Sequence, residues 1–252
     1  MPTPLQFMNQ YRNLQIPYVL DNGRQCVPMT ATIAVRKYFM MNWTEGTDQH
    51  TDYFHVSGGG RRDPWFQQHK DQIRSAAMGK GAPADYQLAL EWAVRSGKIA
   101  NPSQATIQAY CDDRLGIDCS GFATNYLIAN GKKANSSSIK NNTGAASYFQ
   151  PANAVNDSNA VRQGDLLVWM RGNSVMTGPG HVAVVESYRA QCVPGGNMRV
   201  CEATGAAGAN PKLLDSMYSV TQIIPKEGRV PAMILVVDRH GTSGSRVAVI
   251  RL

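Results

Sequence analysis

The sequence predicts an α+β protein in which helices come first and an antiparallel sheet follows. Residues 83–97 and 119–131 carry apolar side chains at helical spacing and end at a glycine, which is typical of helices. From residue 164 onward, short runs rich in β-branched residues alternate with turn residues, which is typical of strands. Helices grouped before strands favour the α+β class over alternating α/β units.

Three helices are expected in the N-terminal part of the chain, which carries no recognisable catalytic motif before residue 80. They cover about residues 30–41, 83–97 and 102–110. Pro83 suits a first helical turn and Gly97 suits a helix end. Residues 57–64, which read Ser-Gly-Gly-Gly-Arg-Arg-Asp-Pro, predict a flexible loop by their composition.

A chemical motif opens the next expected helix, at residues 116–122, Gly-Ile-Asp-Cys-Ser-Gly-Phe. Asp118 can cap this helix, so that the Cys119 sulfur lies at its positive end. A thiol at a helix N-terminus becomes a nucleophile when an imidazole is within reach. His181 is the candidate imidazole, because it opens a strand-like run at residues 182–185. A thiol on a helix that faces a histidine on a sheet is the papain-type arrangement.

The remaining segments complete the expected sheet. Residues 131–160, rich in Asn, Ser, Ala and Gly, predict a long surface loop with one short helix. Strands are expected at residues 164–170, 182–187, 198–203, 232–238 and 246–251.

Three segments together resemble the NlpC/P60 and CHAP group of peptidoglycan hydrolases. Residues 118–122 match the nucleophile motif of that group, residues 163–169 are similar to its first core strand, and residues 180–185 match its histidine strand. The resemblance covers about residues 108–205. It implies a papain-like catalytic core at residues 106–252, with residues 1–105 as a mainly helical extension packed on that core.

The resemblance also implies a reaction and its site residues. Cys119 would be the nucleophile, His181 the general base and then the acid, and Glu202 the polar residue that orients the imidazole. The scissile bond would be an amide in the peptide part of bacterial peptidoglycan, and neither a metal nor a cofactor is expected. A cysteine protease, deamidase or acyltransferase acting on a protein is the alternative within the same fold, and a non-catalytic binding module is a third.

Strand register tests the assignment of Glu202. A tight turn at Gly195-Gly196 would place Glu202 about eight residues, or about 27 Å, from the position opposite His181. The assignment therefore requires a wide loop near residues 188–197. Glu186 is the competing carboxylate, but strand alternation places it on the opposite face from His181.

Other polar groups near Cys119 are expected at the site. Its backbone N–H, at the helix start, can donate to an oxyanion. Asp118 and Ser120 either contact substrate or only cap the helix. Tyr110 is the counterpart of a tyrosine that lies beside the nucleophile in the related hydrolases, and a plain packing role is equally open.

The other cysteines and histidines carry weaker signals. Cys26, Cys111, Cys192 and Cys201 allow two disulfides or four buried thiols, and thiols are favoured. The absence of a CxxC pair disfavours structural zinc, and an odd separation disfavours a Cys192–Cys201 bridge across a regular hairpin. Cys26 lacks the Ser-Gly context of a nucleophile. The expected surface or core histidines are His50, His55, His69 and His240.

Composition limits the partners. The chain has 252 residues, of which 43% are hydrophobic and 17% are charged, as in globular proteins. The formal net charge of +7 suits an anionic partner such as the bacterial wall. Its basic residues are scattered and form no nucleic-acid motif, so no nucleic acid is expected. Without a run of about eighteen apolar residues, no stable membrane insertion is expected.

The N-terminal residues, Met-Pro-Thr-Pro-Leu-Gln-Phe, lack the basic and apolar regions of a secretory signal. A wall hydrolase of this kind would be made in the cytoplasm and delivered by another route to the periplasm of target cells. An interbacterial toxin injected by a contractile secretion system is therefore expected, with an immunity protein as a partner, in preference to a phage lysin.

Overall fold

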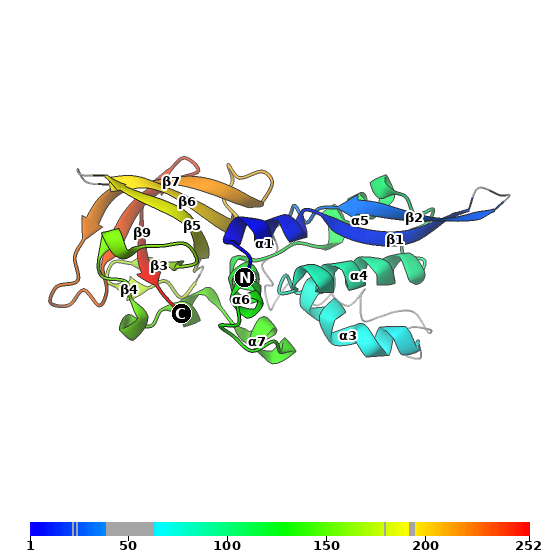
Figure 1. Ribbon diagram of the computed structural model, residues 1–252, viewed down its shortest axis with the longest axis horizontal. Helices are drawn as coiled ribbons and strands as arrows, with labels where there is room; N and C mark the ends of the chain where they lie inside the picture. The colour runs from blue at the N-terminus through cyan, green and yellow to red at the C-terminus, as the bar shows by residue number, and fades with distance from the viewer. Residues whose placement is uncertain (22, 24, 39–62, 179, 192–194) are drawn as a thin grey trace.

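A computed structural model describes residues 1–21, 23, 25–38, 63–178, 180–191 and 195–252 (Figure 1). The helices are α1 (Pro4–Tyr11), α3 (Pro64–Ala77), α4 (Pro83–Arg95), α5 (Gln104–Arg114), α6 (Cys119–Ala129) and α7 (Ser137–Asn142), followed by the short 3-10 turns Ala145–Tyr148, Pro151–Asn153 and Ser158–Ala160. Within this described part, no helix is long and apolar enough to cross a membrane.

The strands form a two-stranded hairpin and a seven-stranded antiparallel sheet. The hairpin joins β1 (Leu14–Asp21) and β2 (Cys26–Ile33). The large sheet contains β3 (Leu166–Arg171), β4 (Ser174–Val175), β5 (Val182–Gln191), β6 (Gly195–Ala203), β7 (Leu213–Ile224), β8 (Ile234–Arg239) and β9 (Thr242–Ile250), in the order β4-β3-β5-β6-β7-β8-β9. Because β9 also pairs with β3, the sheet curls and closes on itself.

Alternation along the strands gives the sheet two apolar faces. On β3, Leu167 and Trp169 belong to the core enclosed by the sheet, whereas Leu166 and Val168 face the helices. The helix-side core also contains residues of the N-terminal extension. Phe7 on α1 lies 5.9 Å from Phe122 on α6, measured between ring centroids. The extension therefore shares one core with the helix that bears Cys119.

The α+β class and the helix-bearing N-terminal region are confirmed, with one element wrong. Residues 30–33 lie in β2 rather than in a helix, and residues 34–38 are not helical either. Ala31 and Ile33 are buried while Thr30 and Thr32 are exposed, which is the period of a strand. Residues 39–41 lie outside the described residues, as do residues 57–62 of the expected loop.

The positions of two N-terminal helices and five strands agree with the prediction, whereas four other elements were not predicted. Helices α4 and α5 cover the two segments predicted at residues 83–97 and 102–110, and the five predicted strands correspond to β3, β5, β6, β8 and β9. Helices α1 and α3 and strands β1 and β7 were not predicted from the sequence. The boundary expected near residue 105 stays a prediction.

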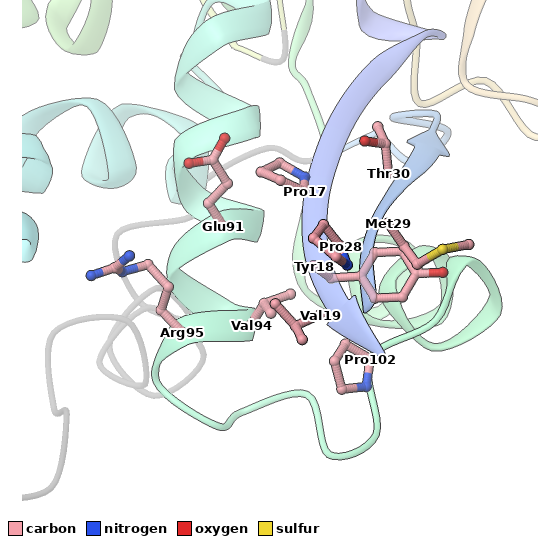
Figure 2. Close-up of a pocket in the computed structure, with 10 residues that line it drawn as sticks. All are labelled: Pro17, Tyr18, Val19, Pro28, Met29, Thr30, Glu91, Val94, Arg95 and Pro102. Carbon is pink, nitrogen blue, oxygen red and sulfur yellow. The ribbon is translucent and has the colours of Figure 1, made fainter. Parts of the chain in front are cut away.

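The β1–β2 hairpin forms one wall of a cavity of about 730 Å³, and α4 contributes to the opposite wall (Figure 2). The lining residues are Pro17, Tyr18, Val19, Pro28, Met29, Thr30, Glu91, Val94, Arg95 and Pro102. A proline cannot donate to a further strand, so Pro17 and Pro28 disfavour strand addition along the hairpin. None of the lining residues belongs to the site around Cys119.

Candidate active site

Cys119 is the first residue of α6, and Asp118 fixes the start of that helix. The Asp118 side chain accepts a hydrogen bond from the backbone N–H of Gly121 and another from Ser120 Oγ, the latter at 3.1 Å. Asn130 caps the C-terminal end of this helix, one residue before the predicted Gly131. The sulfur therefore lies at the positive end of the helix dipole, where a thiolate is favoured.

A lysine from the N-terminal extension completes this cap. Lys80 Nζ lies 2.6 Å from Asp118 Oδ2 and also donates to Ser120 Oγ. Asp118 and Ser120 are buried, so these contacts favour the capping role over substrate contact. The fit is close, because a Cβ at Gly121 would lie 2.2 Å from the Gly79 carbonyl oxygen. Only glycine permits that approach.

Replacing Lys80 by methionine should lower the free energy of unfolding by about 3 kcal/mol, because it leaves the buried Asp118 carboxylate without its cation. Urea unfolding followed by circular dichroism would measure the loss. The double variant Lys80→Met/Asp118→Asn removes both charges and should recover part of it. An equal or larger loss in the double variant would contradict an ion-pair contribution.

His181 and Glu202 meet at neighbouring ends of two antiparallel strands. His181 directly precedes β5, and Glu202 lies one residue before the end of β6. His181 Nε2 lies 2.8 Å from Glu202 Oε2. This bond occupies Nε2, and the charge of Cys119 acts on the same ring and raises the pKa of His181. The structure thus brings together the three residues predicted as nucleophile, base and orienting group.

The prediction of a wide loop before Glu202 is wrong. The β5–β6 ladder continues to the pair Gln191↔Gly195, with one irregularity between Val185 and Ser187. Gly195 and Gly196 lie within β6 rather than at the turn. A Cβ at Gly195 would lie 2.0 Å from the Val220 carbonyl oxygen, so close strand packing explains the glycine. Because Gln191 pairs with Gly195 and Val184 with Cys201, the register differs from the one assumed and brings Glu202 to His181.

Three further donors surround Glu202, which is fully buried. Ser216 Oγ and His240 Nε2 lie 2.7 Å and 2.9 Å from Oε1, and Arg239 Nη1 lies 3.0 Å from Oε2. The prediction that His240 has only a surface or core role is therefore wrong. The sequence could not show this contact, because 38 residues separate it from Glu202.

The charges in this cluster support one another. Burial alone would lower the pKa of His181, but Cys119 and then Glu202 outweigh it and raise that pKa to about 9. Burial alone would raise the pKa of Glu202, but hydrogen bonds from His181 and His240 and the charge of Arg239 hold it well below its usual range. A protonated imidazole beside a sulfur at a helix N-terminus is the environment of a nucleophilic cysteine.

A tyrosine that the sequence did not point to, Tyr38, lies beside the nucleophile. Tyr38 Oη lies 3.7 Å from Cys119 Sγ and also interacts with the Cys119 backbone N–H. A parallel bridge between Tyr38 and Ile117 places it there. Tyr110, on α5, packs against the helix-side core. The sequence did not point to Tyr38, because residues 30–41 were predicted to form a helix.

The other reactive groups do not add to this site. Cys26, Cys111 and Cys201 are free thiols, so the alternative of two disulfides is wrong, and Cys192 lies outside the described residues. Burial raises the pKa of Cys111 to about 12, which makes it a poor nucleophile. Glu186 accepts hydrogen bonds from the Leu5 N–H and from Gln163 instead. Across the described ranges, no three His, Cys, Asp or Glu side chains could hold a metal ion.

A thiol at the start of a helix, opposite a histidine next to the first residue of a strand in a curled antiparallel sheet, places the fold in the papain-like class. Residues 109–204 match the family model of the CHAP domain, which confirms the resemblance to the CHAP and NlpC/P60 hydrolases. The match indicates a hydrolase of peptidoglycan. It ends before β7, so Ser216, Arg239 and His240 lie outside it. No curated protein and no solved structure matches the chain.

Proposed function

We propose that the protein is a cysteine amidase or endopeptidase that cleaves an amide in the peptide part of peptidoglycan through Cys119, His181 and Glu202. The observation that carries the proposal is the position of His181, 2.8 Å from Glu202 and close enough to Cys119 for the charge of that residue to raise the pKa of the imidazole. The CHAP match supplies the substrate class.

The mechanism follows from the positions of the polar groups. The Cys119 thiolate attacks the amide carbonyl carbon, and the negative charge moves to the carbonyl oxygen. His181 then gives its proton to the leaving amine, which departs and leaves a thioester on Cys119. His181 next accepts a proton from water, whose oxygen attacks the thioester and releases the acid and the thiolate. Glu202 keeps the imidazole oriented through both steps.

Two donors beside the sulfur can stabilise the oxyanion. The first is the Cys119 backbone N–H, and the second is the Tyr38 hydroxyl, which lies next to both that N–H and the sulfur. Burial raises the pKa of Tyr38 well above its usual range, so the hydroxyl keeps its proton at any working pH.

Replacing Tyr38 by phenylalanine should therefore lower kcat by about 10²-fold while KM stays nearly constant, because an oxyanion donor acts mainly in the transition state. Steady-state kinetics on a soluble muropeptide would measure both constants. A matched Tyr110→Phe variant should keep wild-type kinetics. A larger loss for Tyr110→Phe than for Tyr38→Phe would contradict the assignment.

Mass spectrometry of purified sacculi tests the reaction itself. Digestion by the wild-type protein should release fragments with a new amine and a new carboxyl end, and their masses identify the cleaved bond. Cys119→Ala should release none. If neither protein releases fragments while iodoacetamide still labels Cys119 near neutral pH, the substrate is a protein amide instead.

We also propose that the target is the wall of another bacterium, reached from the periplasmic side. Expression with a periplasmic signal sequence should lyse cells, whereas cytoplasmic expression should not, because peptidoglycan lies outside the inner membrane. Periplasmic Cys119→Ala should be harmless. Intact cells after periplasmic expression of the active protein would refute the toxin role, and protection by a neighbouring gene product would identify an immunity protein.

A further inference from the structure

A permanent cation shares the Glu202 carboxylate with the imidazole. Oε2 accepts hydrogen bonds from His181 Nε2 at 2.8 Å and from Arg239 Nη1 at 3.0 Å. The Arg239 side chain is 13% exposed and Glu202 is fully buried, so solvent screens this contact only weakly. The imidazolium and the guanidinium share one oxygen, so each weakens the hydrogen bond and the charge attraction between the carboxylate and the other.

Arg239 also supports the imidazole from a second side, through Trp169. The guanidinium carbon lies 4.6 Å from the centre of the Trp169 ring. The Trp169 ring in turn meets the His181 ring edge-on, with centroids 4.5 Å apart and planes at 76°. The carboxylate and the indole together fix the imidazole plane, and one arginine contacts both of them.

The stability of the fold alone does not explain this arginine. Its Nε is buried and has no hydrogen-bond partner among the described residues, which is a cost to the folded state. The next residue, His240, has a φ of 44° in the two-residue turn before β9. That conformation is strained for a residue with a side chain. Both costs occur where two donors point at Glu202.

We propose that Arg239 is a positioning residue that fixes the imidazole through Glu202 and Trp169, and that its charge limits how strongly Glu202 retains the imidazole proton. The inference rests on the Cys119–His181 pair of the proposed function. A limited hold matters because His181 must give its proton to the leaving amine and then take one from water.

The charged and titratable groups around the imidazole come from several elements. They are Cys119 on α6, Tyr38 in the segment after β2, Glu202 on β6, Tyr218 on β7, Arg239 at the end of β8 and His240 in the following turn. Arg239 differs from the rest in carrying a charge that no accessible pH removes.

The test is an NMR titration of His181 in protein labelled with ¹³C-histidine, with the resonance assigned by its loss in His181→Asn. Replacing Arg239 by methionine should raise the pKa of His181 by about one unit above the wild-type value, because a repelling charge and a competing donor are both removed. Arg239→Lys keeps the charge and should stay near wild type. If Arg239→Met does not fold, Arg239→Gln tests the same loss of charge.

A matched control is available on the same sheet. Arg199 pairs with Asp215, at 2.6 Å, and its hydrogen bonds go to that carboxylate rather than to Glu202. Arg199→Met should therefore leave the His181 titration unchanged. An unchanged pKa in the folded, uncharged Arg239 variants would overturn the inference.

Failure of the proposed function would be visible separately. An unchanged His181 titration in Cys119→Ala would refute the Cys–His pair itself, because the charge of Cys119 is a main cause of the raised pKa of His181. The pKa of His181 could change in Arg239→Met while the wild-type protein leaves sacculi intact. That result would refute only peptidoglycan as the substrate.

Discussion

Replacing His181 by alanine is expected to lower kcat/KM on peptidoglycan at least 10⁴-fold, as much as replacing Cys119. The imidazole holds the proton that the leaving amine needs and then accepts one from water, so its loss stops both halves of the reaction. Residues that act as a unit lose most of the rate when any one is removed. The double variant Cys119→Ala/His181→Ala should therefore be no slower than either single variant.

The fold should survive this change, which makes the kinetic result interpretable. Glu202 keeps three donors, from Ser216, Arg239 and His240, when His181 is absent. His69 provides a matched control, because it packs against Trp65 on α3, with ring centroids 4.6 Å apart. His69→Ala should retain activity within about two-fold. Substantial hydrolysis by folded His181→Ala would rule out this residue as the base.

The sequence predicted the parts of the site that local patterns encode. Asp118 and Cys119 are adjacent, and a capping residue followed by an apolar helical run is visible in a few residues. His181 opens a strand whose β-branched residues are equally local. Glu202 was predicted through the resemblance to the hydrolases, and alternation along the strand disfavoured its competitor Glu186.

The register and the supporting residues could not be predicted in the same way. Gly195 and Gly196 suggested a turn, whereas they lie in a strand that another strand approaches closely. Lys80 and Arg239 reach the site from 40 and 37 residues away from their partners Ser120 and Glu202. A short sequence pattern cannot reveal contacts between residues so far apart along the chain. Neither residue lies in the segment that matches the CHAP domain.

Replacing Glu202 by leucine is expected to lower both stability and activity. It leaves the Arg239 cation and the donors of His181 and His240 without their acceptor in a largely buried site, which should cost about 3–5 kcal/mol in the free energy of unfolding. Activity should fall at least 10²-fold, because the imidazole loses both its orientation and its stabilising charge. Urea unfolding and kinetics on muropeptides would measure the two losses.

The pH dependence and a second carboxylate separate this role from a general packing effect. The pKa of Glu202 is lowered in the folded state, so its stabilising contribution is present above its unfolded value of about 4.5 and is lost as the pH falls. The difference in unfolding free energy between wild type and Glu202→Leu should therefore shrink below about pH 4.5. Glu186→Gln, on the same pair of strands, should keep activity within about two-fold. If Glu186→Gln lost more activity than Glu202→Gln, Glu186 rather than Glu202 would orient the imidazole.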